Sequence, residues 1–319
     1  MSGPTGQGGI GGAVYVDGVS QNAEHARFRL EHSEILDSGA NDHGGGIFLY
    51  TIESAASELL LNSSRFGGNR ITGTAPRVGF AGGIYVQNGA LTISSCTFDG
   101  NSSVSMGGAV WWLSSLPALV VNSTFSANRS GNFASALQVS GPLRLANCTL
   151  VGNQADGTFG GALRSGNPDQ VWLRNMVFSG NSCPAQGAVA DVSGTCQDGG
   201  GNLQWPHASG RIPVCAGVVW ADPLLGALGD HGGPCPTHLP LCKARWWMVA
   251  WMGMRLRWTS GDGPALGGPT RGRSNIRRGG KGNVSGSDPG SGRERGGRGR
   301  RFFAVTGAMK RRPVRPVRA

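Results

Sequence analysis

Residues 82–101 read GGIYVQNGALTISSCTFDGN, a stretch that contains both of the motifs that decide the fold. The first motif is a pair of glycines followed by a small or aliphatic residue, here Ile84. The second is an apolar pair at alternate positions, Leu91 and Ile93, followed by Phe98 and then, three positions later, by Asn101. Both motifs recur in the same order along the chain, which is typical of a repeat protein.

The repeats extend over most of the first 190 residues. The third position of the Gly-Gly motif falls at 13, 47, 84, 109, 136, 162 and 188, so the spacing is 34 and 37 residues at first and 25 to 27 afterwards. The second motif places its large apolar residue at Ile35, Phe66, Phe98, Phe125, Leu150 and Phe178, and its amide at Asn69, Asn101, Asn128, Asn153 and Asn181.

Each apolar segment is short and alternates with a period of two, which predicts a short strand rather than a helix. One repeat cannot bury its apolar residues alone. When repeats stack, equivalent apolar residues of successive repeats lie next to one another at a strand spacing of roughly 4.8 Å. The prediction is an all-β fold, a right-handed parallel β-helix of about six to seven coils. A leucine-rich repeat has a similar period but normally carries a second leucine-rich or helical segment, whereas the other half of this repeat reads as strand.

The large apolar residues and the amides are expected to form columns inside the coils. Burial of each large apolar residue contributes roughly 1.5–3 kcal/mol. Asn residues at the same turn of successive coils can bond their side-chain amides to one another, as in amide ladders. Glycine pairs before a strand permit positive φ and a close approach of backbones.

The alternation of Gly-Gly-Ala or Gly-Gly-Ile with Phe-x-x-Asn resembles the repeats of polymorphic outer-membrane proteins and, more broadly, the right-handed parallel β-helices of the pectate-lyase-like superfamily. This resemblance covers about residues 8–182. Residues 199–206, 221–226 and 230–238 resemble the segment after the β-helix in bacterial choice-of-anchor Q domain proteins. The resemblance implies a secreted or surface-exposed solenoid, and it implies no single reaction.

Charge divides the chain near Leu241. Residues 1–240 contain ten Arg, no Lys and fifteen acids, a net charge of −5, whereas residues 241–319 carry nineteen basic residues and three acids, a net charge of +16. We therefore expect a β-helix over 1–195, a loop-rich cap over 196–240 and a disordered, Arg/Gly-rich basic tail over 241–319.

The two ends of the chain depart from the family pattern. The first residues lack the basic and apolar regions of a signal peptide, and no apolar run reaches the roughly 18–20 residues that span a bilayer. The abrupt gain of Arg, Gly and Trp after residue 241 predicts a fragment whose 3′ end is read in a shifted frame.

Lyases and hydrolases of this fold need clustered carboxylates. The only acid between residues 82 and 154 is Asp99, which reads as a turn residue. Two other groups of titratable residues read as solvated edge or turn residues rather than as ligands, namely Glu31, His32 and Glu34, and His207, His231 and His238 with Asp222 and Asp230. The sequence therefore predicts no catalytic site, no metal and no cofactor.

The cysteines fall into two groups. Cys96 and Cys148 occupy the same repeat position two coils apart, where small buried residues are expected. Four others crowd the region after the repeats: Cys183, Cys196, Cys215 and Cys235. In an exported protein these four could form two disulfides across a loop-rich cap, an alternative that the sequence leaves open. Zinc is disfavoured because no Cys-x-x-Cys occurs.

These observations favour a non-catalytic solenoid for adhesion or for contact with surface glycans or with host and matrix proteins. The residues predicted to form its outer carbohydrate-binding face are Trp111, Trp112, Arg164 and Trp172. One alternative is a polysaccharide lyase or glycoside hydrolase, or its inactive relic. Another is binding of RNA or other polyanions through the basic tail. Nothing in the sequence predicts specific recognition of DNA.

Overall fold

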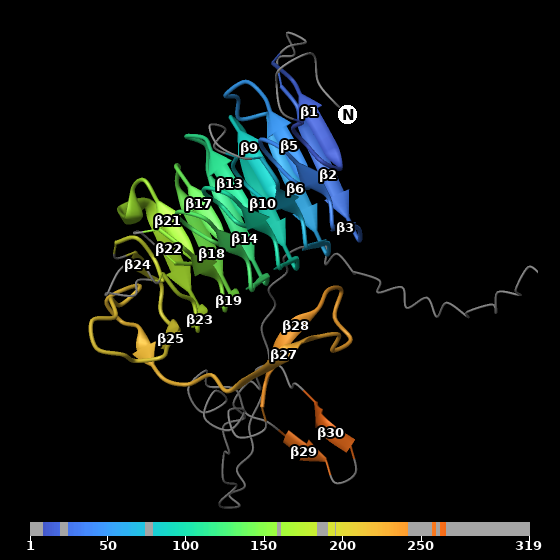
Figure 1. The fold of residues 1–319 in the computed structure, drawn as a ribbon. Helices are drawn as coiled ribbons and strands as arrows, with labels where there is room; N and C mark the ends of the chain where they lie inside the picture. Colours follow the sequence, from blue (N-terminus) through green and yellow to red (C-terminus); the bar gives the residue numbers. More distant parts are fainter. Residues whose placement is uncertain are drawn as a thin grey trace, which may run out of the picture. The chain divides into compact units, whose positions relative to one another are not determined.

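The computed structural model describes residues 9–19, 25–73, 79–157, 161–183, 191–194, 196–241, 257–259 and 262–265. In this part of the chain, strands of successive repeats lie side by side and form a parallel β-solenoid (Figure 1). The prediction of an all-β solenoid is confirmed, with about six coils.

Four parallel sheets run along the solenoid, and we name them A to D in the order in which a coil visits them. Sheet A contains β1 (Val14–Asp17), β5 (Ile47–Tyr50), β9 (Ile84–Gln87), β13 (Val110–Leu113), β17 (Leu137–Val139) and β21 (Leu163–Ser165). Sheet B contains β2 (Arg27–Glu31), β6 (Glu58–Asn62), β10 (Ala90–Ser94), β14 (Ala118–Val121), β18 (Leu143–Ala146), β22 (Val171–Arg174) and β24 (Gln197–Asp198).

Sheets C and D complete each coil. Sheet C contains β3 (Glu34–Leu36), β7 (Arg65–Gly67), β11 (Thr97–Asp99), β15 (Thr124–Ser126), β19 (Thr149–Val151), β23 (Val177–Ser179), β25 (Leu203–Trp205) and β26 (Val219–Trp220). Sheet D contains β4 (Gly39–Ala40), β8 (Arg70–Ile71), β12 (Ser102–Ser103), β16 (Arg129–Ser130) and β20 (Gln154–Ala155). Because β24, β25 and β26 continue sheets B and C, the strand pairing extends past the predicted boundary at residue 195.

The remaining elements lie outside these four sheets. The short 3₁₀ helix η1 (Pro168–Gln170) leads into β22. Two antiparallel pairs follow the solenoid, β27 (Leu225–Gly229) with β28 (Thr237–Pro240), and β29 (Arg257–Thr259) with β30 (Asp262–Ala265). The second pair lies within the range 241–319 that the sequence predicts to be a basic tail. The rest of that predicted tail, and the degenerate repeat at 186–188, lie outside the described residues.

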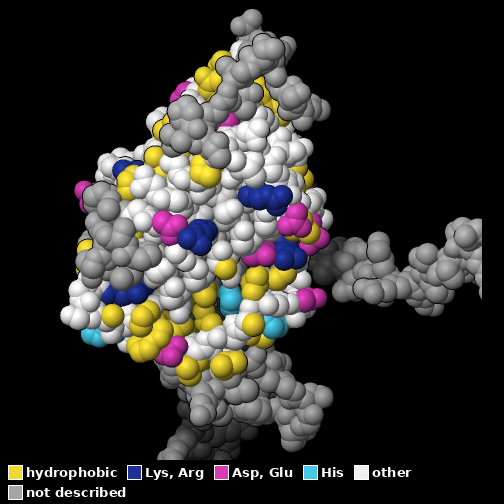
Figure 2. Space-filling model, in the orientation of Figure 1, with side chains coloured by type: hydrophobic (Ala, Val, Ile, Leu, Met, Phe, Trp, Pro, Cys, Tyr) yellow, Lys and Arg dark blue, Asp and Glu magenta, His cyan; other side chains and the backbone are white. Residues whose placement is uncertain are grey.

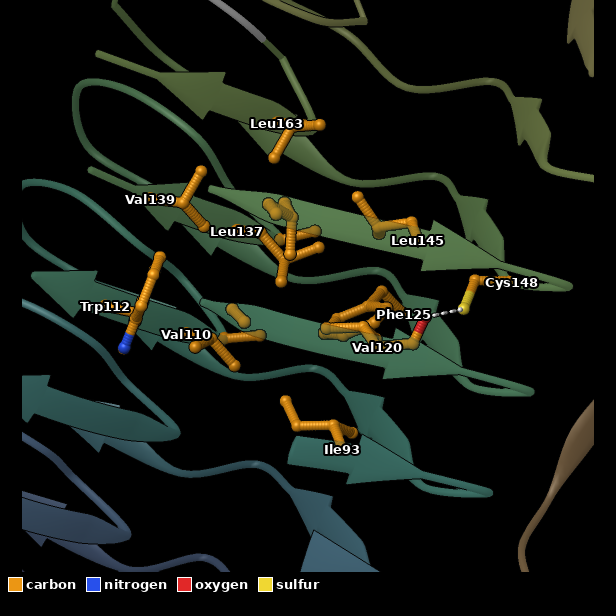
Figure 3. Close-up of a cluster of buried hydrophobic side chains, with 14 of the residues drawn as sticks. Ile93, Val110, Trp112, Val120, Phe125, Leu137, Val139, Leu145, Cys148 and Leu163 are labelled. Carbon is orange, nitrogen blue, oxygen red and sulfur yellow. Dashed lines mark hydrogen bonds between the residues drawn. The ribbon is translucent and has the colours of Figure 1, made fainter. Parts of the chain in front are cut away.

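Inward-facing side chains fill the solenoid, and Figure 3 shows part of this core. The column on sheet C is fully buried and in strand register, and it consists of Phe66, Phe98, Phe125, Leu150 and Phe178. The rings of Phe98 and Phe125 are stacked with their centroids 4.8 Å apart. The rings thus repeat at the strand spacing, which makes the column continuous from coil to coil.

The Asn residues form a second inner column, the Asn ladder, at the corner between sheets C and D. Its members are Asn69, Asn101, Asn128, Asn153 and Asn181, all buried. The Nδ2 group of Asn128 donates both to Asn153 Oδ1 at 2.9 Å and to the Phe98 carbonyl at 3.0 Å. The Oδ1 atom of Asn128 in turn accepts from the side chain and backbone of Asn101. Each Oδ1 therefore accepts from a backbone amide at the corner, and each Nδ2 up to that of Asn153 bonds to the next amide of the ladder and to a carbonyl of the preceding coil.

The Gly-Gly motif has a steric cause. Gly107 adopts a φ of +66°, which disfavours any residue with a Cβ. A Cβ on Gly108 would overlap the Ser135 carbonyl oxygen of the next coil. The motif therefore marks a corner where neighbouring coils approach too closely for a side chain.

A buried polar network closes the C-terminal end of the core. Asp191 accepts a hydrogen bond from Asn181 Nδ2 at 3.0 Å, so the Asn ladder ends on a carboxylate. Arg211 pairs with this carboxylate at 2.8 Å, and Gln204 Nε2 donates to it at 2.5 Å. Burial raises the pKa of Asp191, and the Arg211 guanidinium opposes that shift. The network replaces the apolar stacking that another coil would provide.

The β27–β28 hairpin contacts the outer face of sheet C. The Thr97 hydroxyl donates to the Pro236 carbonyl at 2.6 Å. His238 Nε2 lies 2.9 Å from Ser126 Oγ, and its Nδ1 lies 2.7 Å from the Gly226 carbonyl oxygen. Because Ser126 is itself buried, this pair docks the hairpin rather than presenting a nucleophile.

Candidate functional site

A groove on the outer face of sheet B is the candidate site. Its floor is the column of outward-facing residues between the two inward apolar positions of each strand. These residues are paired across neighbouring strands in the order Arg29, Leu60, Thr92, Leu119, Arg144 and Trp172. The groove extends over the last five strands of this series, from Glu58 on β6 to Trp172 on β22, and has a volume of about 700 Å³. We call it the sheet-B groove.

Apolar groups form much of the surface of the sheet-B groove. Pro117 and Pro142, which directly precede β14 and β18, line one side. Leu119 is 41% exposed and Trp172 is 42% exposed, although each lies on a strand that is paired on both sides in sheet B. Large apolar side chains that stay accessible in a concave site are typical of a ligand-binding surface.

Charged groups border this apolar surface. The Arg144 guanidinium carbon lies 5.7 Å from the centre of the Trp172 ring. Asp169 and Gln170 line the groove from η1, beside Trp172. Among the described residues, Arg144 and Asp169 take part in no ion pair within 4.0 Å. Their charges are therefore available to a ligand.

A further carboxylate lies toward the N-terminal end of the groove. Glu58 on β6 accepts a hydrogen bond from the Thr92 hydroxyl at 3.2 Å. Four strand steps separate β6 from β22, about 19 Å at roughly 4.8 Å per step. Glycosidases hold their two carboxyl groups only about 5–9.5 Å apart. Glu58 and Asp169 therefore do not flank one glycosidic bond.

The four residues predicted to form one carbohydrate-binding face do not lie together, which corrects that prediction. Trp172 lies in the sheet-B groove, whereas Trp111 and Arg164 face outward on sheet A. Trp112 is fully buried and donates its Nε1 hydrogen to the Gly89 carbonyl at 2.7 Å, as its inward position in Figure 3 also shows. Alternation along β13 sends Trp111 and Trp112 to opposite sides of the sheet, so Trp112 cannot reach an outer ligand.

Trp111 and Arg164 are engaged on sheet A. The Trp111 ring packs against Phe80 at 3.9 Å and Tyr85 at 4.7 Å between centroids. Arg164 lies 5.0 Å from the Phe133 ring and donates to Gln138 at 3.3 Å. These contacts cover the outer surface of sheet A with its own side chains.

Sequence reasoning missed Arg144, Asp169, Leu119 and Glu58 as members of the site. A signal for Arg144 and Leu119 was present, because the residue between the two apolar positions of the second motif must point outward. Asp169 precedes its strand, and only the path of η1 brings it to the groove.

The titratable residues considered from the sequence do not converge. Glu31 pairs with Arg29 at 2.7 Å, and this hydrogen bond lowers the pKa of Glu31. Glu34 lies on sheet C instead and is 4.0 Å from Arg65. The His207 ring packs on Trp220, whereas His238 contacts Ser126. No group of three metal-ligating side chains occurs among the described residues.

The six cysteines of the described ranges are free thiols, and all six are buried. The two disulfides that the sequence left open are thus not formed in this structure. The backbones of Cys196 and Cys215 form an isolated parallel β-bridge, with no bond between the sulfur atoms. Burial raises the pKa of Cys196 to about 12 and that of Cys215 to about 11. Cys183 donates instead to the Gly157 carbonyl at 2.7 Å. Such thiols are protonated at neutral pH and unreactive.

Charge on the outer surface is mixed. Figure 2 shows basic and acidic side chains interspersed on the face that it draws. Two ion pairs of the described residues join Arg65 to Asp99 at 2.8 Å and Arg129 to Asp156 at 2.9 Å. No helix in the described part of the chain is long and apolar enough to cross a membrane.

Comparison with known proteins identifies no relative, since no protein-family profile, no curated protein and no solved structure matches this chain. The resemblance to polymorphic outer-membrane repeats and to choice-of-anchor Q domains therefore stays a prediction.

Proposed function

We propose that this protein is a non-catalytic solenoid that binds an extended glycan in the sheet-B groove, at a cell surface or outside the cell. The observation that carries the proposal is the accessible Trp172 ring beside Arg144 and Asp169, whose charges no described residue neutralises. An indole ring stacks on the apolar face of a sugar, while carboxylate, amide and guanidinium groups bond its hydroxyls.

The length of the groove favours a chain of several sugars over a single one. Its lining residues come from successive strands, from Glu58 on β6 to Trp172 on β22. This distance of about 19 Å follows from four strand steps of roughly 4.8 Å. Bonding groups repeat along this line, so a linear ligand can contact several coils at once.

Glycan-array screening followed by calorimetry with the best oligosaccharide tests the proposal. We expect Trp172→Ala to weaken binding by at least about tenfold, because it removes the stacking surface. Trp111→Ala is the matched control, since it truncates an outward tryptophan on sheet A. The proposal fails if no glycan binds, if Trp172→Ala binds as tightly as wild type, or if both variants lose binding equally.

The two alternative functions have weaker support. A hydrolase or lyase needs carboxylates that meet at one bond, whereas Glu58 and Asp169 lie at opposite ends of the groove. Binding of RNA rests on the net charge of +16 over residues 241–319, most of which lie outside the described residues.

A further inference from the structure

Charge is distributed unevenly along the outer face of sheet B. On β6, β10 and β14, which the structure describes in full, alternate residues face outward. These outward residues are Glu58, Leu60, Asn62, Ala90, Thr92, Ser94, Leu119 and Val121. None of them is basic, and only Glu58 carries a charge. The strands under the middle of the sheet-B groove therefore offer no cation to a ligand.

The basic residues of sheet B lie on either side of this interval. Arg27 and Arg29 are on β2, where Arg29 is already paired with Glu31 at 2.7 Å. Arg144 on β18 is the only basic residue among the described residues that line the groove, and Arg174 follows on β22. Four strand steps of roughly 4.8 Å separate β2 from β18, so about 19 Å of sheet lies between Arg29 and Arg144.

A polyanionic glycan does not suit this surface. A polyuronate carries a carboxylate on every sugar, so several carboxylates would face β6, β10 and β14. Each would lose part of its hydration beside Leu119 or the two prolines of the groove without gaining a cation. At the β6 end the chain would also meet the Glu58 carboxylate, and like charges repel each other.

A polycationic glycan does not suit it either. The two carboxylates of the groove, Glu58 and Asp169, lie near its opposite ends, and Arg144 lies between them. Amino groups on successive sugars would therefore face the same uncharged strands and would be repelled by Arg144.

We infer that the glycan bound in the sheet-B groove is uncharged, a chain of neutral or N-acetylated sugars. This inference rests on the proposed function and names the chemical class of its ligand. Hydroxyl and amide groups can bond to the polar side chains of the groove, while the apolar faces of the sugars cover Leu119 and the prolines.

The charges beside Trp172 also suit a neutral sugar. A hydroxyl group both donates and accepts a hydrogen bond, a carboxylate accepts, and a guanidinium donates. Asp169 lines the groove beside Trp172, and the Arg144 guanidinium carbon lies 5.7 Å from the centre of the Trp172 ring. A sugar stacked on this ring therefore meets both a donor and an acceptor, whereas a charged sugar would be attracted by one group and repelled by the other.

Competition for the groove of the full chain tests the inference. The probe is the glycan-array ligand whose binding is lost in Trp172→Ala, labelled with a fluorophore, and we expect it to be uncharged. Unlabelled neutral and uronate oligosaccharides of equal length then compete with it. Polyanions bound by residues 241–319 do not displace a ligand of the groove, so displacement reports the groove alone. We expect the uronate chain to require at least about a tenfold higher concentration than the neutral chain.

Leu119→Lys places a cation in the middle of the groove. Leu119 is 41% exposed, so circular dichroism should stay as in wild type. The concentration of uronate needed for displacement, relative to that of the neutral chain, should fall by at least about threefold. Thr92→Lys on the neighbouring strand should act in the same direction. Val104→Lys is the matched control, because Val104 is 44% exposed and does not line the groove, and it should keep the preference of wild type.

The outcomes separate this inference from the proposed function. If no glycan binds through Trp172, both are wrong. If the Trp172-dependent ligand is a polyanion, or if uronate and neutral chains displace the probe equally well, the groove still binds glycans but the inference is wrong. The inference is also overturned if Leu119→Lys and Thr92→Lys keep the preference of wild type, or if Val104→Lys changes it as much as they do.

Discussion

At the scale of single residues, the buried Asn side chains stabilise the corner between sheets C and D. Each Asn of the ladder lies where the backbone turns, beside backbone amides of the preceding coil that bond to its Oδ1. The side chain satisfies these groups and bonds to the next coil at the same time. An apolar residue of the same size would fill the space but leave buried polar groups unpaired.

Asn128→Ala should therefore lower the free energy of unfolding by about 2–3 kcal/mol, because it leaves the buried Asn101 backbone amide without its acceptor and breaks the amide ladder on both sides. Asn122→Gly is the control, since Asn122 is exposed and its φ of 51° suits glycine, so its loss should stay below about 0.5 kcal/mol. Equilibrium unfolding in urea measures both. Equal losses in the two variants would contradict the role of the ladder.

The positions of the Asn ladder and the Phe column were predictable because both recur with the repeat. The direction of Trp112 was not predicted, although it follows from alternation along β13 once the position of the strand is known. Arg144 and Asp169 belong to the groove for a reason that one repeat does not contain, because the groove exists only where several coils are stacked.

At the scale of elements, the segment around Asp191 and strand β25 together end the solenoid core. The column of amides and the column of apolar residues both need a partner after the last coil, and Asp191 and Gln204 supply it. A carboxylate in this place costs desolvation, which Arg211 offsets. The cap is thus a polar substitute for another coil.

Arg211→Met removes that compensation, and we expect a loss of about 3–5 kcal/mol near pH 7. In the variant the folded-state pKa of Asp191 lies above its unfolded value. The folded state then binds more protons between the two values, and stability falls as pH rises through the folded-state pKa. The deficit against wild type should therefore be smaller near pH 5 than near pH 7.

Urea unfolding of wild type and variant at both pH values measures this difference. Asp191→Asn combined with Arg211→Met is the control, because the amide has no charge to bury and its deficit should not depend on pH. A deficit for Arg211→Met that is the same at both pH values would show that Asp191 does not titrate there.

Charge separates the whole molecule into two parts. The part that contains the solenoid has a net charge of −5, and residues 241–319 have a net charge of +16. Glycan binding, as proposed, belongs to the first part and any binding of polyanions to the second. The two functions can therefore be separated by a single truncation.

Truncation after Leu241 should abolish binding of RNA, if the full chain binds it, and should leave glycan affinity unchanged. Contacts of Arg and Lys with phosphates release counterions, so the affinity of the full chain for RNA should fall steeply with salt. Fluorescence anisotropy with labelled RNA over a salt series measures this. RNA binding that survives truncation would place it on the solenoid instead.

The sequence by itself determined the all-β class, the stacking of the repeats and the residues of the inner columns. Each of these depends on a period that one coil repeats, namely alternation within a strand and a spacing of 25 to 27 residues between coils. Only the tertiary structure decided which outward residues share a face and how Asp191 and Arg211 close the core. These features join residues from different coils or lie outside the repeat, so no local pattern specifies them.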